Sequence, residues 1–198
     1  MKLLFILPEY YPHSGGGIST YYQELVPSLL PFCSKIKIIV GSGYSQGGKK
    51  IDLGGIDVDY LKPELFQKYI SKFSKYRIFP ELLNNIAAAW AMWEQVKDDD
   101  FDAIECTDFG LAFIPWLIHH KKPVKIQLHG STGQIGFFDP KISEELQTDF
   151  YRKIELLFFE LADQLQTHSL ANKSFWEQQL HNKTINYILP IYENITPQ

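Results

Sequence analysis

The feature that most constrains the fold of this chain is a regular alternation between short apolar runs and longer segments with helical spacing. Apolar runs of strand length occur at residues 3–7, 36–40, 101–106, 124–128, 164–168 and 185–189. Helical spacing covers residues 17–30, 80–97, 109–118, 144–162 and 172–180. Strands that alternate with helices predict an α/β fold with a parallel sheet and helices on both of its faces. Ligands of such folds bind beyond the carboxyl ends of the strands, so the residues after each strand are the first site candidates.

Two segments interrupt this alternation. Residues 41–61 are rich in glycine and end in an alternating apolar pattern, which predicts a loop with a short extra strand. Residues 43–50 approach a P-loop, but Lys50 replaces the required Ser or Thr and no helix is expected to follow. Residues 62–79 carry five basic side chains beside an aromatic stripe, which suits either docking on an anionic membrane surface or simple coverage of the core.

Three consecutive glycines, Gly15, Gly16 and Gly17, lie between the first expected strand and the first expected helix. Glycines there allow backbone N–H groups to approach a phosphate closely, next to the positive end of the helix dipole. The alternative is a tight turn that only needs positive φ. A dinucleotide fingerprint is incomplete, because Thr20 stands at the third glycine position and no acidic residue ends the second strand.

Polar residues follow three of the other expected strands. His129 follows residues 124–128 and is suited to contact a sugar or a reacting group, or to sit in a capped turn. Glu105 and Asp108 could bind sugar hydroxyls, although Asp108 is also a plausible helix N-cap, which we favour for it. Ser169 could contact a ligand or cap the next helix equally well. His119 and His120 close a helix, where a cation suits the dipole, and are expected to be structural.

Charge and cysteine content narrow the function classes. The formal net charge of −4 removes the global basic field on which nucleic-acid binders rely, so a nucleic-acid partner is not expected. The two cysteines are distant and no cluster has metal-ligand spacing, which indicates a reducing compartment and no metal. The apolar N-terminus is too short for a signal peptide or a membrane span, so we expect a cytoplasmic chain, with peripheral contact on the inner face of the membrane as an option for residues 62–79.

Taken together, these motifs resemble the N-terminal domain of a family 4 glycosyltransferase of the GT-B class, a group of retaining enzymes. The resemblance rests on the opening strand with Pro8, the loop at residues 12–17, the Asp-Ala-Ile-Glu at 102–105, His129-Gly130, and the segments 160–163 and 167–169. It implies a Rossmann-like domain over residues 1–190, the start of an interdomain linker at residues 191–198, and an absent C-terminal domain.

The resemblance also implies roles for the candidate residues. Gly15, Gly16 and Gly17 would face the donor's diphosphate, and His129 would be the catalytic contact with the transferred sugar or the reacting hydroxyl. His13, Glu105, Asp108 and Ser169 would be contacts for a sugar or an acceptor. The partners would be a nucleotide-sugar donor and a sugar or lipid-linked acceptor, with no cofactor, and the chain alone would be inactive. The alternative function is a stand-alone module that binds a sugar or a phosphate without catalysis.

Overall fold

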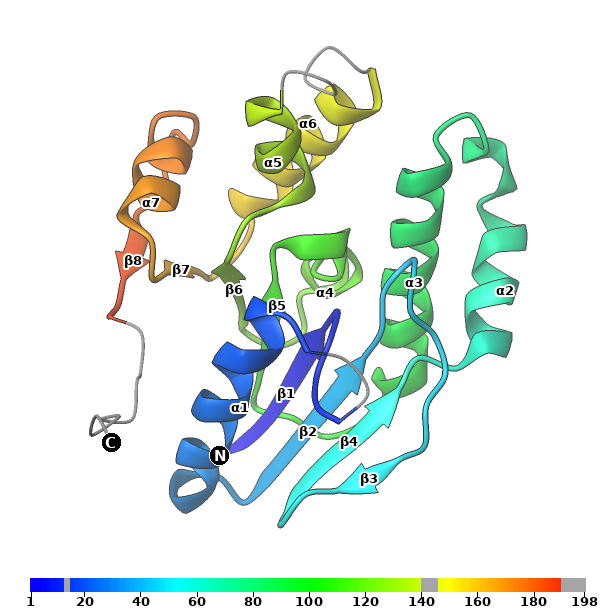
Figure 1. Ribbon diagram of the computed structural model, residues 1–198, viewed down its shortest axis with the longest axis vertical. Coiled ribbons are helices and arrows are strands. Elements are labelled where there is room, and N and C mark those ends of the chain that lie inside the picture. Colours follow the sequence, from blue (N-terminus) through cyan, green and yellow to red (C-terminus); the bar gives the residue numbers. More distant parts are fainter. Residues whose placement is uncertain (13–14, 140–145, 190–198) are drawn as a thin grey trace, which may run out of the picture.

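In the computed structural model, residues 1–12, 15–139 and 146–189 are described, and they form a single sheet with helices on its two faces (Figure 1). The strands are β1 (Lys2–Leu7), β2 (Lys35–Val40), β3 (Ile51–Asp52), β4 (Ile56–Tyr60), β5 (Ala103–Thr107), β6 (Val124–Leu128), β7 (Gln164–Thr167) and β8 (Ile185–Tyr187). The helices are α1 (Gly17–Leu29), α2 (Pro63–Lys72), α3 (Pro80–Val96), α4 (Ile114–His119), α5 (Thr132–Phe138), α6 (Leu146–Phe159) and α7 (Leu170–Glu177).

The sheet has the strand order β3-β4-β2-β1-β5-β6-β7-β8, and every neighbouring pair except β3 and β4 is parallel. From β1 the chain first builds β2 and β4 on one side, and then crosses to build β5 to β8 on the other side. The sequence therefore reverses its direction of strand addition between β1 and β5. Such a switch point leaves a crevice at the carboxyl ends of the two central strands. The predicted parallel α/β fold is confirmed.

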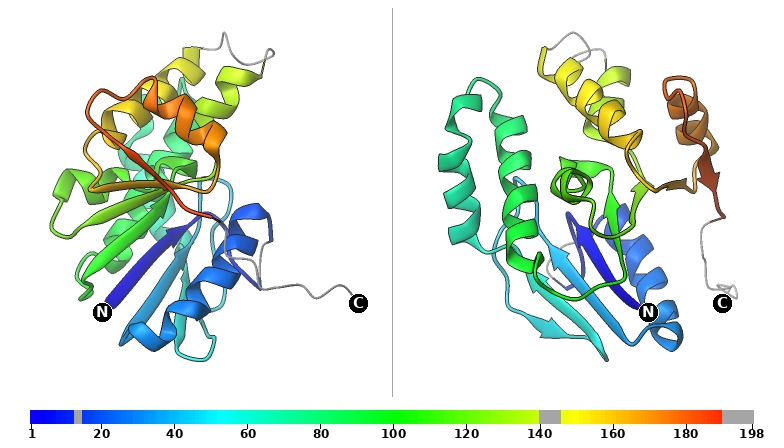
Figure 2. Two further views of the ribbon diagram at one scale, coloured as in Figure 1. Left: turned by 90° about the vertical axis from the view of Figure 1, so that its left-hand side faces the viewer. Right: turned by 180° about the vertical axis from the view of Figure 1, so that it is seen from behind.

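The two faces of the sheet carry separate apolar cores. On one face, Tyr22 and Val26 of α1 pack with Phe5, Ile38 and neighbouring residues of β1, β2 and β4. On the other face, residues of α3, α4, α6 and α7 pack on the remaining apolar side chains of the sheet. Figure 2 shows the sheet between these layers. Both faces of β1 and β2 are covered, which explains why these strands are continuous apolar runs in the sequence.

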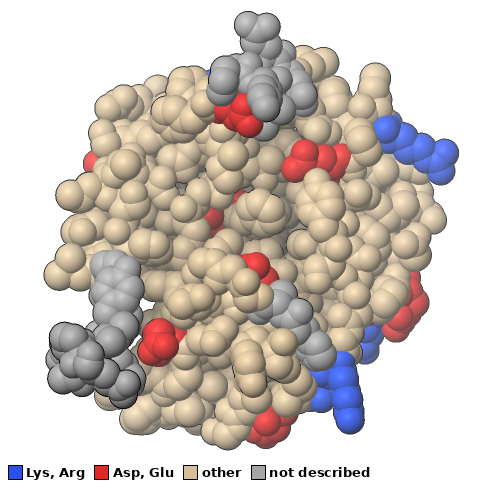
Figure 3. Space-filling view, in the orientation of Figure 1, with Lys and Arg blue, Asp and Glu red and all other residues tan. Residues whose placement is uncertain are grey.

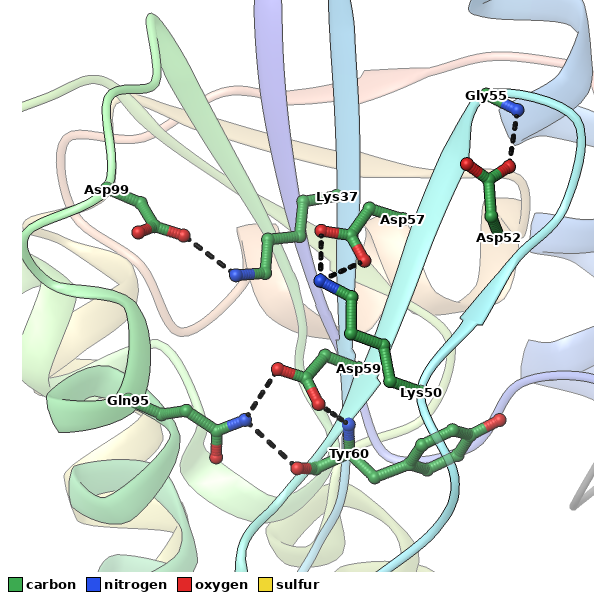
Figure 4. A network of polar contacts seen from close by, with 9 residues as sticks. All are labelled: Lys37, Lys50, Asp52, Gly55, Asp57, Asp59, Tyr60, Gln95 and Asp99. Carbon is green, nitrogen blue, oxygen red and sulfur yellow. Dashed lines mark hydrogen bonds and ion pairs between the residues drawn. The ribbon is translucent and has the colours of Figure 1, made fainter.

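The expected extra strand at residues 56–61 is β4, and a polar network fixes it to its neighbours (Figure 4). Gln95 of α3 donates to the Asp59 carboxylate at 3.1 Å and to the Tyr60 carbonyl at 3.0 Å. Lys50, which directly precedes β3, forms an ion pair with Asp57 of β4. Lys50 is followed by β3 and not by a helix, so the rejection of a P-loop at residues 43–50 is confirmed.

The basic-aromatic segment at residues 62–79 forms α2 and a short 3-10 turn, and its aromatic side faces α3. Phe66 and Tyr69 are buried, and the Tyr69 ring stacks on Trp90 of α3. The lysines at positions 62, 68, 72 and 75 stay exposed. Basic side chains accordingly mark the edge of the molecule in Figure 3. The aromatic stripe thus covers the core, and only the basic side of α2 remains available for an anionic surface.

Two local differences from the sequence expectations concern helices. The expected helix at 109–118 is split into a 3-10 turn and α4, because Gly110 has φ of 78°, which an α-helix does not accommodate. Helix α5 was not expected. Its segment contains Gly133 and Gly136, which lower helix propensity, and it is held by tertiary contacts instead.

Candidate functional site

A pocket of about 1220 Å³ opens at the carboxyl ends of the central strands. It lies at the switch point of the sheet, where the fold predicts a ligand site. The residues after β1, β2, β5, β6 and β7 all contribute to it. Its polar lining includes Glu9, Ser42, Ser45, His129, Gln134, His168 and Asn172, and its apolar lining includes Ile18, Tyr44, Phe109, Ile135, Phe138 and Ala171.

The glycine loop forms one wall of this pocket, through Gly16 and Gly17. None of the three glycines has positive φ, so the alternative of a turn that demands positive φ is not supported. Gly16 instead lies close to a carboxylate. A Cβ at this position would lie 2.5 Å from Oε1 of Glu9, so a larger residue here would require the Glu9 side chain to move.

Glu9 is a pocket residue that the sequence analysis missed. Its carboxylate accepts the Ser19 N–H of the first turn of α1 at 3.1 Å. A negative side chain therefore occupies the helix N-terminus at which a phosphate was expected, as the dipole favours. An anionic ligand at this end of α1 has to share these donors with Glu9 or displace its side chain. A carboxylate two residues after the first strand was the available signal.

His129 lines the same pocket and lies within a cluster of rings. Its ring centroid is 5.1 Å from that of Tyr21, 5.8 Å from that of Tyr22 and 5.0 Å from that of His168. Burial, and then the neighbouring His168 and Lys125, lower the pKa of His129 to about 3. The imidazole is therefore neutral at physiological pH. Its buried Nε2 has no hydrogen-bond partner among the described residues.

Asp108 occupies the N-cap position of the 3-10 turn at Phe109–Leu111, as we favoured, but its side chain makes no capping hydrogen bond. It is fully buried, and its two carboxylate oxygens accept the N–H groups of His129 and Gly130, each at 3.0 Å. Burial raises its pKa to about 7 against the opposing effect of these hydrogen bonds. The local capping signal was overridden because β5 and β6 are neighbours, which brings the end of β6 within reach of Asp108.

The other candidate contacts lie outside the pocket lining. Glu105 accepts the Tyr22 hydroxyl at 2.9 Å and pairs with Lys125 at 2.6 Å, so this carboxylate is engaged beneath α1. Ser169 caps α7 by accepting the Asn172 N–H at 3.2 Å, which is its structural alternative. Gly15 is exposed and does not line the pocket. His13 lies outside the described residues.

Other sequence candidates have structural surroundings. His119 stacks on Trp93 with ring centroids 4.3 Å apart, and His120 contacts Asp163 at 2.8 Å, which confirms the structural interpretation of both. Across residues 1–12, 15–139 and 146–189, no group of three or more His, Cys, Asp or Glu side chains could hold a metal ion. Within the same ranges, no helix combines the length and apolar character that a membrane crossing requires.

Neither known protein-family models nor curated protein sequences match this chain. Solved structures do match it. Phytolacca americana UGT2, in complex with UDP-2-fluoro-glucose and pterostilbene, has a TM-score of 0.62 at 12% identity, over 98% of this chain and 54% of the other. Sucrose-phosphate synthase of Thermosynechococcus elongatus has a TM-score of 0.61 at 12% identity, over 96% and 48%. Trehalose-6-phosphate synthase OtsA has a TM-score of 0.54 at 17% identity, over 89% and 43%.

These neighbours are glycosyltransferases of the GT-B class, and the chain spans about half the length of each of the three. At such low identity the likeness concerns the fold. The pocket at the switch point is therefore found in a domain whose fold is similar to one half of a GT-B glycosyltransferase.

Proposed function

We propose that this chain is the acceptor-side domain of a retaining glycosyltransferase of family 4, which moves a sugar from a nucleotide-sugar donor to a hydroxyl acceptor. The observation that carries the proposal is the pocket between the glycine loop at α1 and the neutral His129, in a fold shared with glycosyltransferases. Two neighbours are described as complexes with UDP-2-fluoro-glucose, which supports a nucleotide-sugar as the donor class.

In the proposed reaction, the bond between the sugar and the donor's diphosphate breaks and a bond to the acceptor oxygen forms on the same face of the sugar. The acceptor proton passes to the departing diphosphate. Backbone N–H groups at Gly16 and Gly17 stabilise the charge that develops on this leaving group. Neutral His129 can accept a hydrogen bond, which a protonated ring could not do. Its Nε2 is buried among the rings of Tyr21, Tyr22 and His168, so contact with a sugar hydroxyl or the reacting hydroxyl requires these rings to shift. The reaction as proposed needs no metal and no cofactor.

The pocket has one wall of backbone and polar groups and an exposed rim with Tyr44, Ile135 and Phe138. A second domain, which we place after a linker beginning near residue 191, would supply the nucleotide site and close the pocket. The isolated chain would then be inactive. We further propose a cytoplasmic location in which α2 contacts an anionic membrane surface, which fits a lipid-linked acceptor. Co-sedimentation with phosphatidylglycerol vesicles tests this contact. If replacing Lys68, Lys72 and Lys75 by neutral residues leaves the co-sedimentation unchanged, the contact is refuted.

Sugar transfer from radiolabelled UDP-glucose, with a mixture of sugar and lipid-linked acceptors, tests the proposal. The sample is residues 1–198 joined to a nucleotide-sugar-binding domain. Replacing His129 by Ala should lower the rate by about 100-fold or more, a typical loss for a group acting on a reacting proton. His181→Ala is the matched control, because this exposed histidine lies outside the pocket. Equal rates for both variants would contradict the role of His129. Saturable sugar binding without transfer would instead favour a binding module.

A further inference from the structure

The loop between β6 and α5 is tied to two buried carboxyl groups, and the first of these is Asp108. This residue follows β5, and each of its carboxylate oxygens accepts one loop N–H group, from His129 and from Gly130. An asparagine could not reproduce this arrangement. Its side chain has one carbonyl oxygen, and its amide nitrogen would face the second N–H as donor against donor.

The second carboxyl group belongs to Glu155 of α6, which is fully buried as well. It accepts the Ser131 hydroxyl at 2.7 Å and the Gly133 N–H at 3.1 Å. The Ser131 oxygen in turn accepts the Gln134 N–H at 3.0 Å, which begins α5. A Cβ on Gly133 would clash with the Glu155 carboxylate and with the Arg152 backbone, so the loop and α6 are in direct contact.

These four hydrogen bonds connect four of the five residues 129–133 to two acids that are far apart in the sequence. The loop cannot move relative to β5 or α6 without breaking bonds to a buried acid, which leaves a desolvated group without a partner. The arrangement also opposes stability, because burial raises the pKa of both Asp108 and Glu155. Two costly buried acids around one short loop indicate that the position of this loop matters for function.

We propose that Asp108 and Glu155 are positioning residues, which hold the β6–α5 loop so that the His129 ring keeps its place in the wall of the pocket. Because the N–H groups of His129, Gly130 and Gly133 are already engaged, the loop does not present them to a ligand as an anion-binding set. The loop instead places the imidazole in the pocket lining, where its Nε2 is buried and has no partner among the described residues. The catalytic consequence rests on the proposed function, whereas the position of the ring does not.

The test measures the His129 ring in the 198-residue chain. Asp108→Asn and Glu155→Gln remove one acceptor each, and Asp163→Asn is the matched control. Asp163 also accepts a backbone N–H, from Val124, but at the amino end of β6 and away from the pocket. Histidine modification by diethyl pyrocarbonate, read by peptide mass spectrometry, reports the exposure of each ring. His119 and His181 are internal references for general unfolding, whereas His120 is not, because its ring contacts Asp163.

We expect the modification rate of His129 to rise about fivefold or more in either pocket variant, through local opening of the loop. The nuclear Overhauser contacts between His129 and Tyr21 should weaken in parallel. His129 in the control variant, and the two reference histidines in all variants, should stay at wild-type values. Unchanged His129 reactivity and contacts in the folded variants would overturn the proposal, and so would an equal rise in all histidines. If neither variant folds, Ser131→Ala removes the hydroxyl bond to Glu155 and the cap on the Gln134 N–H while both acids remain. A rise in His129 reactivity then supports the proposal, and unchanged reactivity overturns it.

A second arm separates this inference from the proposed function. In the transfer-competent protein, Asp108→Asn should lower kcat by roughly 100-fold with little change in KM for the donor. The reason is that a displaced His129 ring loses its contact with the reacting groups in the transition state, whereas donor binding does not depend on that contact. A displaced His129 ring with unchanged transfer would support the positioning role and contradict the catalytic role of His129. An undisplaced ring with impaired transfer would overturn the positioning role.

Discussion

The two buried acids beside the pocket predict that the stability of the folded chain falls as the pH rises from 6.5 to 8. Burial raises the pKa of Asp108 from 3.8 to about 7 and that of Glu155 from 4.5 to about 8, the latter also through the Asp108 charge. A carboxyl group with a raised pKa binds more protons in the folded state than in the unfolded state. Its contribution is therefore complete in acid and is lost as the pH rises through the folded pKa.

The size of the fall follows from integrating proton binding over this range. Asp108 contributes a loss of about 1 kcal/mol and Glu155 about 2 kcal/mol. His129 acts in the opposite direction, because its lowered pKa favours folding above pH 6.5, and it offsets a small part of this loss. His168, whose pKa burial also lowers, adds a smaller offset of the same sign. The net loss in the free energy of unfolding is about 2 kcal/mol.

Urea denaturation followed by tryptophan fluorescence at pH 6.5, 7.0, 7.5 and 8.0 measures this loss. For a chain of this size, the midpoint should fall by roughly 0.5 to 1 M urea across the series. Glu155→Gln should remove the larger part of the pH dependence, whereas Glu94→Gln, at an exposed ion pair, should leave it intact. A midpoint that stays constant or rises with pH in the wild-type protein would refute the burial and protonation of these acids.

Three further predictions concern single contacts. Tyr22→Phe should lower the free energy of unfolding by about 1 to 3 kcal/mol, because the buried Glu105 loses a donor, and an unchanged urea midpoint would contradict this. Gly133→Ala should destabilise the chain by about 1 to 3 kcal/mol through overpacking against Glu155, measured in the same way, and wild-type stability would show that the loop has room to spare. Glu9→Gln should tighten the binding of inorganic pyrophosphate severalfold in calorimetry, because it removes a carboxylate that competes with the anion for the N-terminus of α1. Weaker binding would mean that Glu9 assists the ligand.

The parallel sheet and the helix layers on its two faces could be anticipated, because continuous apolar runs are typical of strands buried on both faces. The runs that became β1 and β2 are of this kind. Helix α5 could not be anticipated, because Gly133 and Gly136 are weak helix formers and are required by close contacts with α6. Local propensity carries no information about such contacts.

Residues of the candidate site could be predicted where they follow a strand, but not where their role depends on partners that are distant in the sequence. His129 and Gly16 were found because each follows a strand at the edge where the pocket lies. Asp108 was assigned to a cap from its local position, whereas its partners are 21 and 22 residues away. Glu155 has no local signal at all, since an acid in the middle of a helix is usually exposed.

The most direct test of the central claim is a ¹H–¹⁵N NMR titration with UDP-glucose at millimolar concentration, carried out on residues 1–198 joined to a nucleotide-sugar-binding domain. If the pocket receives a nucleotide-sugar, saturable shifts should occur at the amides of Gly16, Gly17 and His129, and they should be smaller in Gly16→Val. The amides around Trp93, at the opposite end of the sheet, should not move. Saturable shifts confined to that opposite end, or no shift at the three pocket amides, would contradict the claim that this pocket binds the donor.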